Sequence, residues 1–181
     1  MHAPPGAEAL PALQYDRELL GIIARNMRRL GGPHADFDDL VQKALLETHR
    51  SLPTFRGECH LQTFLYSICY RVWIHHLRWR SRFLRRFVLS DEGVLPEQID
   101  SRNPAELLAY RQRYSELYGA LDMLPAPMRA VVVLHDLDEL ELEEIAEIVE
   151  ANVHTVRSRL RHGRQKLRTI LEKKALREGH K

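Results

Sequence analysis

The stretch EEIAEIVEANVHTVRSRLRHGRQKLR, residues 143–168, changes its charge half-way while keeping one pattern of apolar residues. Its first half is acidic and contains no Lys or Arg, whereas its second half carries Arg or Lys at nearly every second or third position. Apolar residues recur every three or four positions on both sides of a short break at EANVH. This spacing predicts two short amphipathic helices joined by a tight turn, which is a helix-turn-helix.

The apolar stripes of these two helices determine which side chains remain outside. The stripes are Leu142, Ile145, Ala146 and Val149, then Val156, Leu160, Gly163 and Leu167. The outer face of the second helix then holds donors that can reach base edges and phosphates in a major groove. These donors are Thr155, Arg157, Ser158, Arg161, His162 and Arg164. An ordinary solvated basic surface is the alternative interpretation. We expect Thr155 or His154 to cap this helix and Gly163 to allow a close helix approach.

The remaining chain also has helical periodicity, which predicts an all-α protein of two small domains. Residues 89–104, LSDEGVLPEQIDSRNP, have Gly, Pro, Ser and Asn without an apolar stripe, as is typical of a flexible linker. We therefore expect a disordered N-terminus (1–11), a first domain (12–88), the linker (89–104), a second domain (105–175) and a basic tail (176–181). In the first domain, Asp36 is a plausible N-cap for the helix that begins in DFDDLVQ.

A second basic zone precedes the linker, because residues 71–90 contain six Arg and no acid. The segment FLYSICYRVWIHHLRWRSRFLRRF mixes these cations with aromatic rings. Its rings are Tyr66, Tyr70, Trp73, Trp79 and Phe83, and its cations include Arg71, Arg78, Arg80 and Arg82. Single-stranded nucleic acid is bound by this combination, since rings stack on bases and cations pair with phosphates. For Trp73 and Trp79, a place in the hydrophobic core is an equal alternative.

Composition excludes several classes of protein. The 181 residues have a net charge of +2 and two cysteines, Cys59 and Cys69, which are too few for a disulfide framework and favour a reducing compartment. The sequence has no signal peptide and no membrane-spanning stretch, so a cytoplasmic location is expected. Candidate metal ligands lack the short, fixed spacing of zinc sites: Cys59, His60, Cys69, His75 and His76. Asp36, Asp38 and Asp39 are better explained as an acidic helix start than as an ion site. We expect no catalytic activity, cofactor, metal or small-molecule substrate.

The order of these segments resembles an extracytoplasmic-function sigma factor, a small two-domain subunit of bacterial RNA polymerase. DFDDLVQKALL is similar to the helix that binds the polymerase clamp. FRGECHLQTFLYSICYRVWIHHLRWR is similar to the loop and helix that melt and capture the minus-ten element. LPAPMRAVVVLHDLDELELEEIAEIVEANVHTVRSRLRHGRQKLR is similar to the domain whose helix-turn-helix binds the minus-thirty-five element. The resemblance covers residues 12–87 and 105–171. It implies that the two domains are sigma regions 2 and 4.

The resemblance implies partners and contact residues. The expected partners are core RNA polymerase (the beta-prime clamp and the beta flap), promoter DNA and an anti-sigma factor that can hold the protein at the inner membrane. The implied polymerase contacts are Asp36, Asp38, Asp39, Leu40, Gln42 and Lys43. The implied minus-ten contacts are Arg56, Gly57, Glu58, His60, Phe64, Arg71, Trp73, His75, Arg78 and Arg80. The implied minus-thirty-five contacts are His154, Thr155, Arg157, Ser158, Arg159, Arg161, His162 and Arg164.

The chain departs from the family pattern at several positions. Lys43 replaces a common Glu, Phe64 a Trp and Arg71 an Asn, so promoter preference cannot be transferred from the family. Glu150 occupies a turn position usually held by Gly; a positive φ there would cost about 1–2 kcal/mol, unless the turn is built around Asn152. A stand-alone helix-turn-helix regulator would explain residues 105–171 alone, and a nuclease would need carboxylates that converge on a metal. The sigma hypothesis requires the outer face of residues 155–164 to stay accessible.

Overall fold

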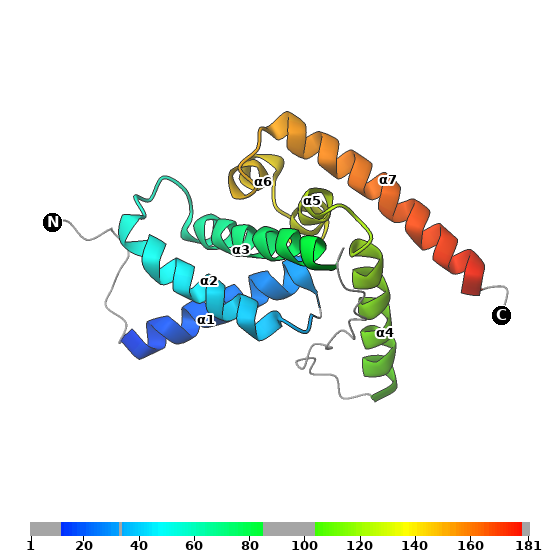
Figure 1. Ribbon diagram of the computed structural model, residues 1–181, viewed down its shortest axis with the longest axis horizontal. Helices are drawn as coiled ribbons and strands as arrows, with labels where there is room; N and C mark the ends of the chain where they lie inside the picture. The colour runs from blue at the N-terminus through cyan, green and yellow to red at the C-terminus, as the bar shows by residue number, and fades with distance from the viewer. Residues whose placement is uncertain (1–11, 33, 85–103, 179–181) are drawn as a thin grey trace.

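The computed structural model describes residues 12–32, 34–84 and 104–178, and its secondary structure in these ranges is entirely helical (Figure 1). The α-helices are α1 (Ala12–Gly31), α2 (Phe37–Ser51), α3 (Leu61–Leu84), α4 (Pro104–Leu121), α5 (Ala126–Asp136), α6 (Leu142–Ile148) and α7 (Val153–Glu178), with a 3-10 helix η1 (Leu52–Thr54) after α2. The expected all-α class is confirmed. The predicted disordered N-terminus and nearly all of the linker lie outside the described residues. No helix in the described ranges is long and apolar enough to cross a membrane.

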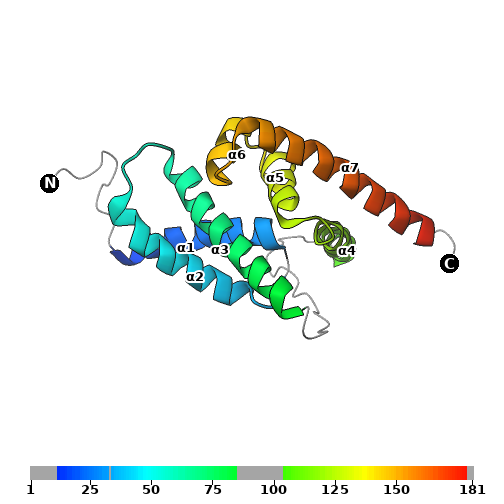
Figure 2. The same cartoon turned by 45° about the horizontal axis from the view of Figure 1, so that its top comes forward.

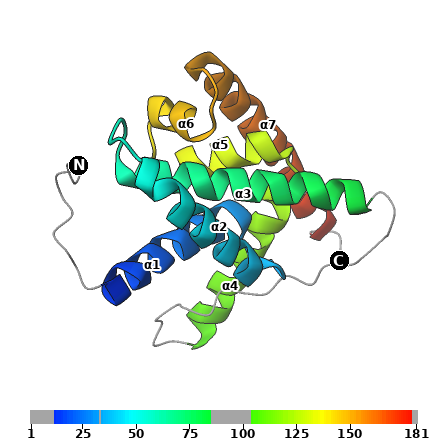
Figure 3. The same ribbon diagram turned by 60° about the vertical axis from the view of Figure 1, so that its left-hand side comes forward.

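The first unit, α1–α3, is held together by the apolar stripes of its three helices. Ile23 and Leu30 of α1, Ala44 of α2 and Leu65 and Cys69 of α3 are fully buried where these helices meet. Each of the first two helices is amphipathic, and burying an apolar stripe against two neighbours removes it from water. Figure 3 shows α3 lying between the α1–α2 pair on one side and α5 and α6 on the other.

The second unit, α4–α7, is centred on α5. Residues 129–134 of α5 are all buried, and α7 packs along this helix from one side. Pro125 and Pro127 stand at the start of α5, where the missing backbone N–H is not needed. Figure 2 shows the first half of α7 lying across α5 and its later part passing beside α4.

The two units are in contact, and a buried arginine lies in the interface. Arg129 of α5 is 3% exposed, and its Nη2 donates a 2.6 Å hydrogen bond to the carbonyl of Gly31 at the end of α1. Its guanidinium also lies over Trp73 of α3, 5.2 Å from the ring centroid, and bonds to Asp122. Burial lowers the pKa of Arg129 to about 10, so the side chain keeps its charge at neutral pH.

A glycine turn after α1 gives this interface its close approach. Gly32 has a φ of +66°, and a Cβ atom there would lie 2.1 Å from the Tyr118 ring of α4. Only glycine fits both the left-handed backbone and the space. The Tyr118 hydroxyl donates a 2.9 Å hydrogen bond to the carbonyl of Arg29. Gly32 therefore lets the end of α1 approach α4 and helps to join the two units.

Acidic residues of the second unit pair with cations of the first. Asp138 bonds to Arg29 of α1 and accepts a hydrogen bond from the Tyr66 hydroxyl of α3. Burial raises the pKa of Asp138, and the bonds from Tyr66 and Arg29 oppose that rise. Farther along, Arg71 of α3 lies 2.9 Å from Glu150 in the turn before α7. Two of the acids that precede the basic helix, Asp138 and Glu150, thus pair with cations of the first unit.

Candidate nucleic-acid interface

The helix-turn-helix is formed by α6, a four-residue connection with one strained residue, and α7. A capping box starts α6, in which the Glu141 backbone N–H donates to the Glu144 side chain at 3.2 Å and the Glu141 side chain accepts from the backbone of Glu144. Glu150 in the turn has a φ of 50°, the positive value that the glycine of the family pattern suggests. A non-glycine residue in this conformation costs about 1–2 kcal/mol.

Asn152 caps α7, which corrects the prediction that Thr155 or His154 does so. The Asn152 Oδ1 accepts a 2.7 Å hydrogen bond from the backbone N–H of Thr155, and α7 begins one residue after this cap. Asn is among the best N-cap residues because its side-chain oxygen reaches the free N–H groups of the first turn. The positive φ falls on Glu150, so the first of the two alternatives considered from the sequence holds, and Asn152 contributes the cap of α7.

The predicted inner stripe of α7 is confirmed. Val156 and Leu160 are buried together with Ile145 and Ile148 of α6. Gly163 is buried against α5, and a Cβ atom at this position would lie 2.7 Å from Val132 Cγ2. The glycine therefore lets the recognition helix approach α5 more closely than any other residue would.

The outer face of α7 remains accessible while the two units are in contact. The exposed side chains on it are His154, Arg157, Ser158, Arg161 and Arg164, and those of Thr155, Arg159 and His162 are partly exposed. This meets the accessibility condition of the sigma hypothesis. Arg164 also turns back toward α5, where its Nε donates a 3.0 Å hydrogen bond to Asp136.

The aromatic residues of α3 do not all form a stacking surface. Tyr66, Tyr70 and Trp73 are between 2% and 9% exposed and belong to the core. In this arrangement Trp73 cannot stack on a base, because its ring packs beside Gly31 and under Arg129. Trp79, in contrast, is 52% exposed. The prediction that Trp73 contacts DNA is therefore wrong for this arrangement, and Trp79, left out of the predicted contact set, presents the accessible ring.

The loop before α3 presents the residues implied to capture a base. Arg56, Gly57, Glu58 and His60 are exposed, and Gly57 has a φ of +74° with open space around it. Phe64 is partly buried and packs on Phe55, with ring centroids 4.7 Å apart. Along α3 the implied contacts Arg71, His75 and Arg78 are exposed and Arg80 is partly exposed.

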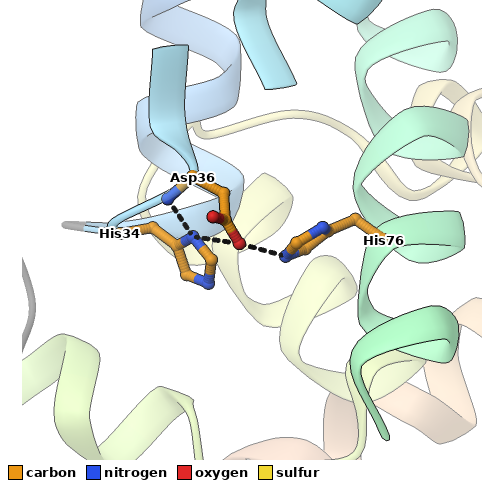
Figure 4. A group of neighbouring side chains, drawn as sticks. All are labelled: His34, Asp36 and His76. Atoms are coloured by element: carbon orange, nitrogen blue, oxygen red, sulfur yellow. Dashed lines mark hydrogen bonds and ion pairs between the residues drawn. The ribbon is translucent and has the colours of Figure 1, made fainter. Parts of the chain in front are cut away.

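The residues implied to contact polymerase, at the start of α2, differ in exposure. Asp38, Asp39, Gln42 and Lys43 are exposed, as a polymerase contact requires. Leu40 does not belong to this surface, because its side chain is 3% exposed and packs in the core. Asp36 occupies the N-cap position but accepts no capping hydrogen bond, which corrects the predicted cap; its carboxylate faces His34 and His76 instead (Figure 4).

A groove of about 710 Å³ runs between α2 and α3. Its lining includes Asp39, Lys43 and Glu47 from α2 and Arg71, His75 and Trp79 from α3. Residues implied to contact polymerase and residues implied to contact DNA thus lie on opposite walls of one groove. The sequence could not show this, because the two helices are joined through a loop whose path the periodicity does not specify.

Burial raises the thiol pKa of both cysteines, which disfavours the reactive thiolate. Cys59 and Cys69 are both free, and Cys69 is buried. Burial raises the pKa of Cys69 to about 12, so this thiol stays protonated and unreactive at neutral pH.

The sequences of the two units match the family models of two regions of one protein family. The model of Sigma-70 region 2 matches residues 16–83, and the model of Sigma-70 region 4 matches residues 114–167. The chain belongs to the sigma-70 family, in its extracytoplasmic-function class. The class is supported by two relatives, the ECF RNA polymerase sigma factor SigE of Mycolicibacterium smegmatis and the ECF RNA polymerase sigma-E factor of Escherichia coli K12.

These relatives match most of the sigma factor chain. The M. smegmatis protein is 32% identical over 145 residues, which are 80% of this chain and 55% of that protein. The chain therefore spans about half the length of this relative. The E. coli protein is 29% identical over 164 residues, 86% of this chain and 82% of that protein.

Two solved structures share the fold. A sigma factor RpoE from Bartonella quintana, in complex with the anti-sigma factor NepR, has a TM-score of 0.66 at 20% identity and covers 89% of this chain and 96% of its own. CnrH in complex with the cytosolic domain of CnrY has a TM-score of 0.57 at 23% identity and covers 88% of this chain and 86% of its own.

Proposed function

We propose that this sigma factor binds core RNA polymerase and directs initiation at promoters recognised by both of its units, without catalytic activity of its own. The observation that carries the proposal is the exposed, cationic outer face of α7, presented by a capped helix-turn-helix on a unit separate from α3. A helix of this kind fits a major groove, and its arginines supply both base and phosphate contacts. We propose residues 12–88 and 105–175 as the two functional domains, acting in the cytoplasm.

Each unit has a separate part in this proposal. Asp38, Asp39, Gln42 and Lys43 bind the polymerase clamp, and the second unit contacts the beta flap. Arg56, His60 and Trp79 hold the unpaired minus-ten strand, aided by Arg71, Arg78 and Arg80. Arg157, Ser158 and Arg161 bind the minus-thirty-five duplex, flanked by His154 and His162. Trp79 is added to this set because its ring is already exposed in the docked arrangement, where that of Trp73 is buried.

Promoter binding requires the two units to separate. The two promoter elements are about 25 base pairs apart by their names, which is about 85 Å of duplex at 3.4 Å per base pair. In the docked arrangement, however, Arg71 of α3 is 2.9 Å from Glu150 of the helix-turn-helix. We infer that the docked arrangement belongs to the free protein and that polymerase holds the units apart, with residues 89–104 as the tether.

We propose an anti-sigma factor as a further partner. Two of the solved structures that share the fold are complexes, one with the anti-sigma factor NepR and the other with the cytosolic domain of CnrY. The 710 Å³ groove between α2 and α3 offers such a partner polymerase-contacting and DNA-contacting residues together. A partner seated there would block both contacts at once.

Reconstituted transcription tests the proposal. The full chain should associate with core polymerase and direct run-off transcription from a promoter found by sequencing transcripts after overexpression. Replacing Arg157 and Arg161 by Ala should reduce promoter use while leaving polymerase binding intact, and Asp39→Ala should do the reverse. Arg168→Ala is a matched control, since Arg168 is an exposed cation on α7 that pairs with Glu172.

Two results would contradict the proposal. Tight, specific duplex binding without polymerase, together with no association with core enzyme, would instead identify a stand-alone regulator. Equal loss of polymerase binding and promoter use in both variants would show that the two surfaces do not have separate parts.

A further inference from the structure

Three side chains from two parts of the chain converge where the α1–α2 loop meets α3 (Figure 4). His34 and Asp36 precede α2, and His76 lies on α3; one potential ligand atom from each lies within 4.8 Å of the other two. Asp36 Oδ2 is 3.4 Å from His76 Nε2 and 3.9 Å from His34 Nδ1. Ligand atoms around a tetrahedral ion with bonds of about 2.0–2.1 Å lie about 3.3 Å apart. Both carboxylate–imidazole pairs are thus within about 0.6 Å of metal-bound spacing.

The buried imidazole of His76 is not accounted for by hydrogen bonding. Its side chain is 9% exposed, and its Nε2 is buried without a hydrogen-bond partner although it points to the Asp36 carboxylate. Buried polar atoms are nearly always hydrogen-bonded, and one left unsatisfied costs about 1–3 kcal/mol. An ion between Nε2 and the carboxylate would satisfy both groups.

Asp36 gives an independent indication. It occupies the N-cap position of α2, where an Asp side chain ordinarily accepts a helix N–H and contributes about 0.5–2 kcal/mol. Here the carboxylate makes no such bond and faces the two imidazoles. Its side chain is 50% exposed, whereas that of His34 is 12% exposed, so the cluster is open to solvent on the Asp36 side. Water can therefore enter to complete the coordination of an ion.

We propose that His34, Asp36 and His76 form a site for a divalent first-row transition-metal ion such as Zn²⁺, bound by two imidazole nitrogens and one carboxylate oxygen. Imidazole ligands favour Zn²⁺, Fe²⁺, Co²⁺ and Ni²⁺, whereas Mg²⁺ and Ca²⁺ prefer oxygen ligands alone. An ion there links the loop before α2 to α3. This inference is independent of the proposed function, because it concerns only binding within the first unit.

The positive charge of Arg80 disfavours a cation at this site, so an Arg80 variant provides a further test. Its Nη1 lies 2.5 Å from His34 Nε2, while the backbone N–H of Asp36 faces His34 Nδ1 at 3.1 Å. A neutral imidazole has one lone pair, so it can accept only one of these donors. Coordination through Nδ1 uses this lone pair and leaves the proton on Nε2, so the Asp36 N–H loses its acceptor and Arg80 must turn away. Removing this neighbouring cation should strengthen metal binding.

Cobalt and zinc titrations of the full chain test the site. Co²⁺ should bind with 1:1 stoichiometry and give visible d–d absorption, which Zn²⁺ displaces, and Zn²⁺ should raise the melting temperature. Asp36→Asn, His34→Gln and His76→Gln should each weaken binding at least tenfold. His75→Gln should stay within twofold, because His75 is the exposed neighbour on the same helix and lies outside the cluster. Arg80→Gln should bind at least as tightly as the unmodified chain.

The titrations contain their own controls. The chain has 10 histidines, so binding by scattered residues would appear as equal losses in His75→Gln and His76→Gln, and would overturn the proposal. Absence of saturable binding in the unmodified chain would overturn it as well. Circular dichroism without metal checks that each variant is folded; if His76→Gln is not, the half-exposed Asp36→Asn decides the outcome.

Discussion

Replacing Gly163 by Ala should destabilise the second unit, whereas the same replacement at Gly21 should stabilise the first. A Cβ atom at Gly163 would lie 2.7 Å from Val132 Cγ2 and 3.4 Å from the Met128 carbonyl oxygen. Carbon atoms in contact are ordinarily about 3.5–4.0 Å apart, so Val132 or the helix must move by about 1 Å. Val132 is buried and its β-branched side chain is stiff, so overpacking should cost about 1–3 kcal/mol.

Gly21 is the matched control. It also lies inside a long helix, but a Cβ atom there would be 3.8 Å from its nearest neighbour, the Nη1 of Arg25. Gly→Ala in a helix interior gains about 1 kcal/mol of helix propensity at both positions. This gain cancels in the comparison, so the two variants should differ by the overpacking cost alone, about 1–3 kcal/mol.

Denaturant unfolding can follow the two units separately. Both tryptophans, Trp73 and Trp79, are in α3, so their fluorescence reports the first unit, whereas far-ultraviolet circular dichroism reports both. Two probes are needed because two units need not unfold in one step. In a Val132→Ala background the clash is absent, and Gly163→Ala should then become stabilising. If Gly163→Ala is as stable as Gly21→Ala, the close contact of α7 with α5 is not a constraint and the argument fails.

Three further predictions follow from particular contacts. Asn152→Ala should remove the cap of α7 and lower the free energy of unfolding of the second unit by about 0.5–2 kcal/mol in denaturation, while Asn152→Asp should retain most of it. Trp73→Ala should destabilise the first unit by about 3–5 kcal/mol, whereas Trp79→Ala should change stability by less than about 0.5 kcal/mol and reduce promoter melting in permanganate footprinting; equal stability losses would show that Trp79 is also a core residue. Gly32→Ala should separate the units, because its Cβ atom would overlap Tyr118, and small-angle scattering should then record a larger radius of gyration than for the unmodified chain.

The sequence predicts the helices and the recognition face well, because these depend on local periodicity. The stripe through Val156, Leu160 and Gly163 places the outer face of α7 without knowledge of anything that packs on it. The cap of α7 was harder to predict, because Asn152, His154 and Thr155 lie close together at the turn and only the backbone geometry selects Asn152.

Tertiary contacts explain the incorrect predictions. Trp73 and Trp79 lie six residues apart in one basic, aromatic helix, and nothing local distinguishes the buried ring from the exposed one. The difference arises from α1 and α5, which cover Trp73 through Gly31 and Arg129. The cluster of His34, Asp36 and His76 was missed for the same reason, since its members come from a loop and a helix brought together only by the fold.

The charge reversal at residues 143–168 has a consequence for how the docked units separate. Arg71 is implied to contact DNA, and in the docked arrangement the same guanidinium pairs with Glu150. The two side chains are 50% and 63% exposed, and an exposed pair of this kind contributes at most about 1 kcal/mol. A DNA phosphate can therefore replace Glu150 at little cost, while the Arg129 and Tyr118 contacts at the other end of the interface are buried. In the function we propose, Glu150 of the turn therefore occupies a DNA-contacting cation in the docked arrangement, and the basic helix that follows attracts the DNA that releases it.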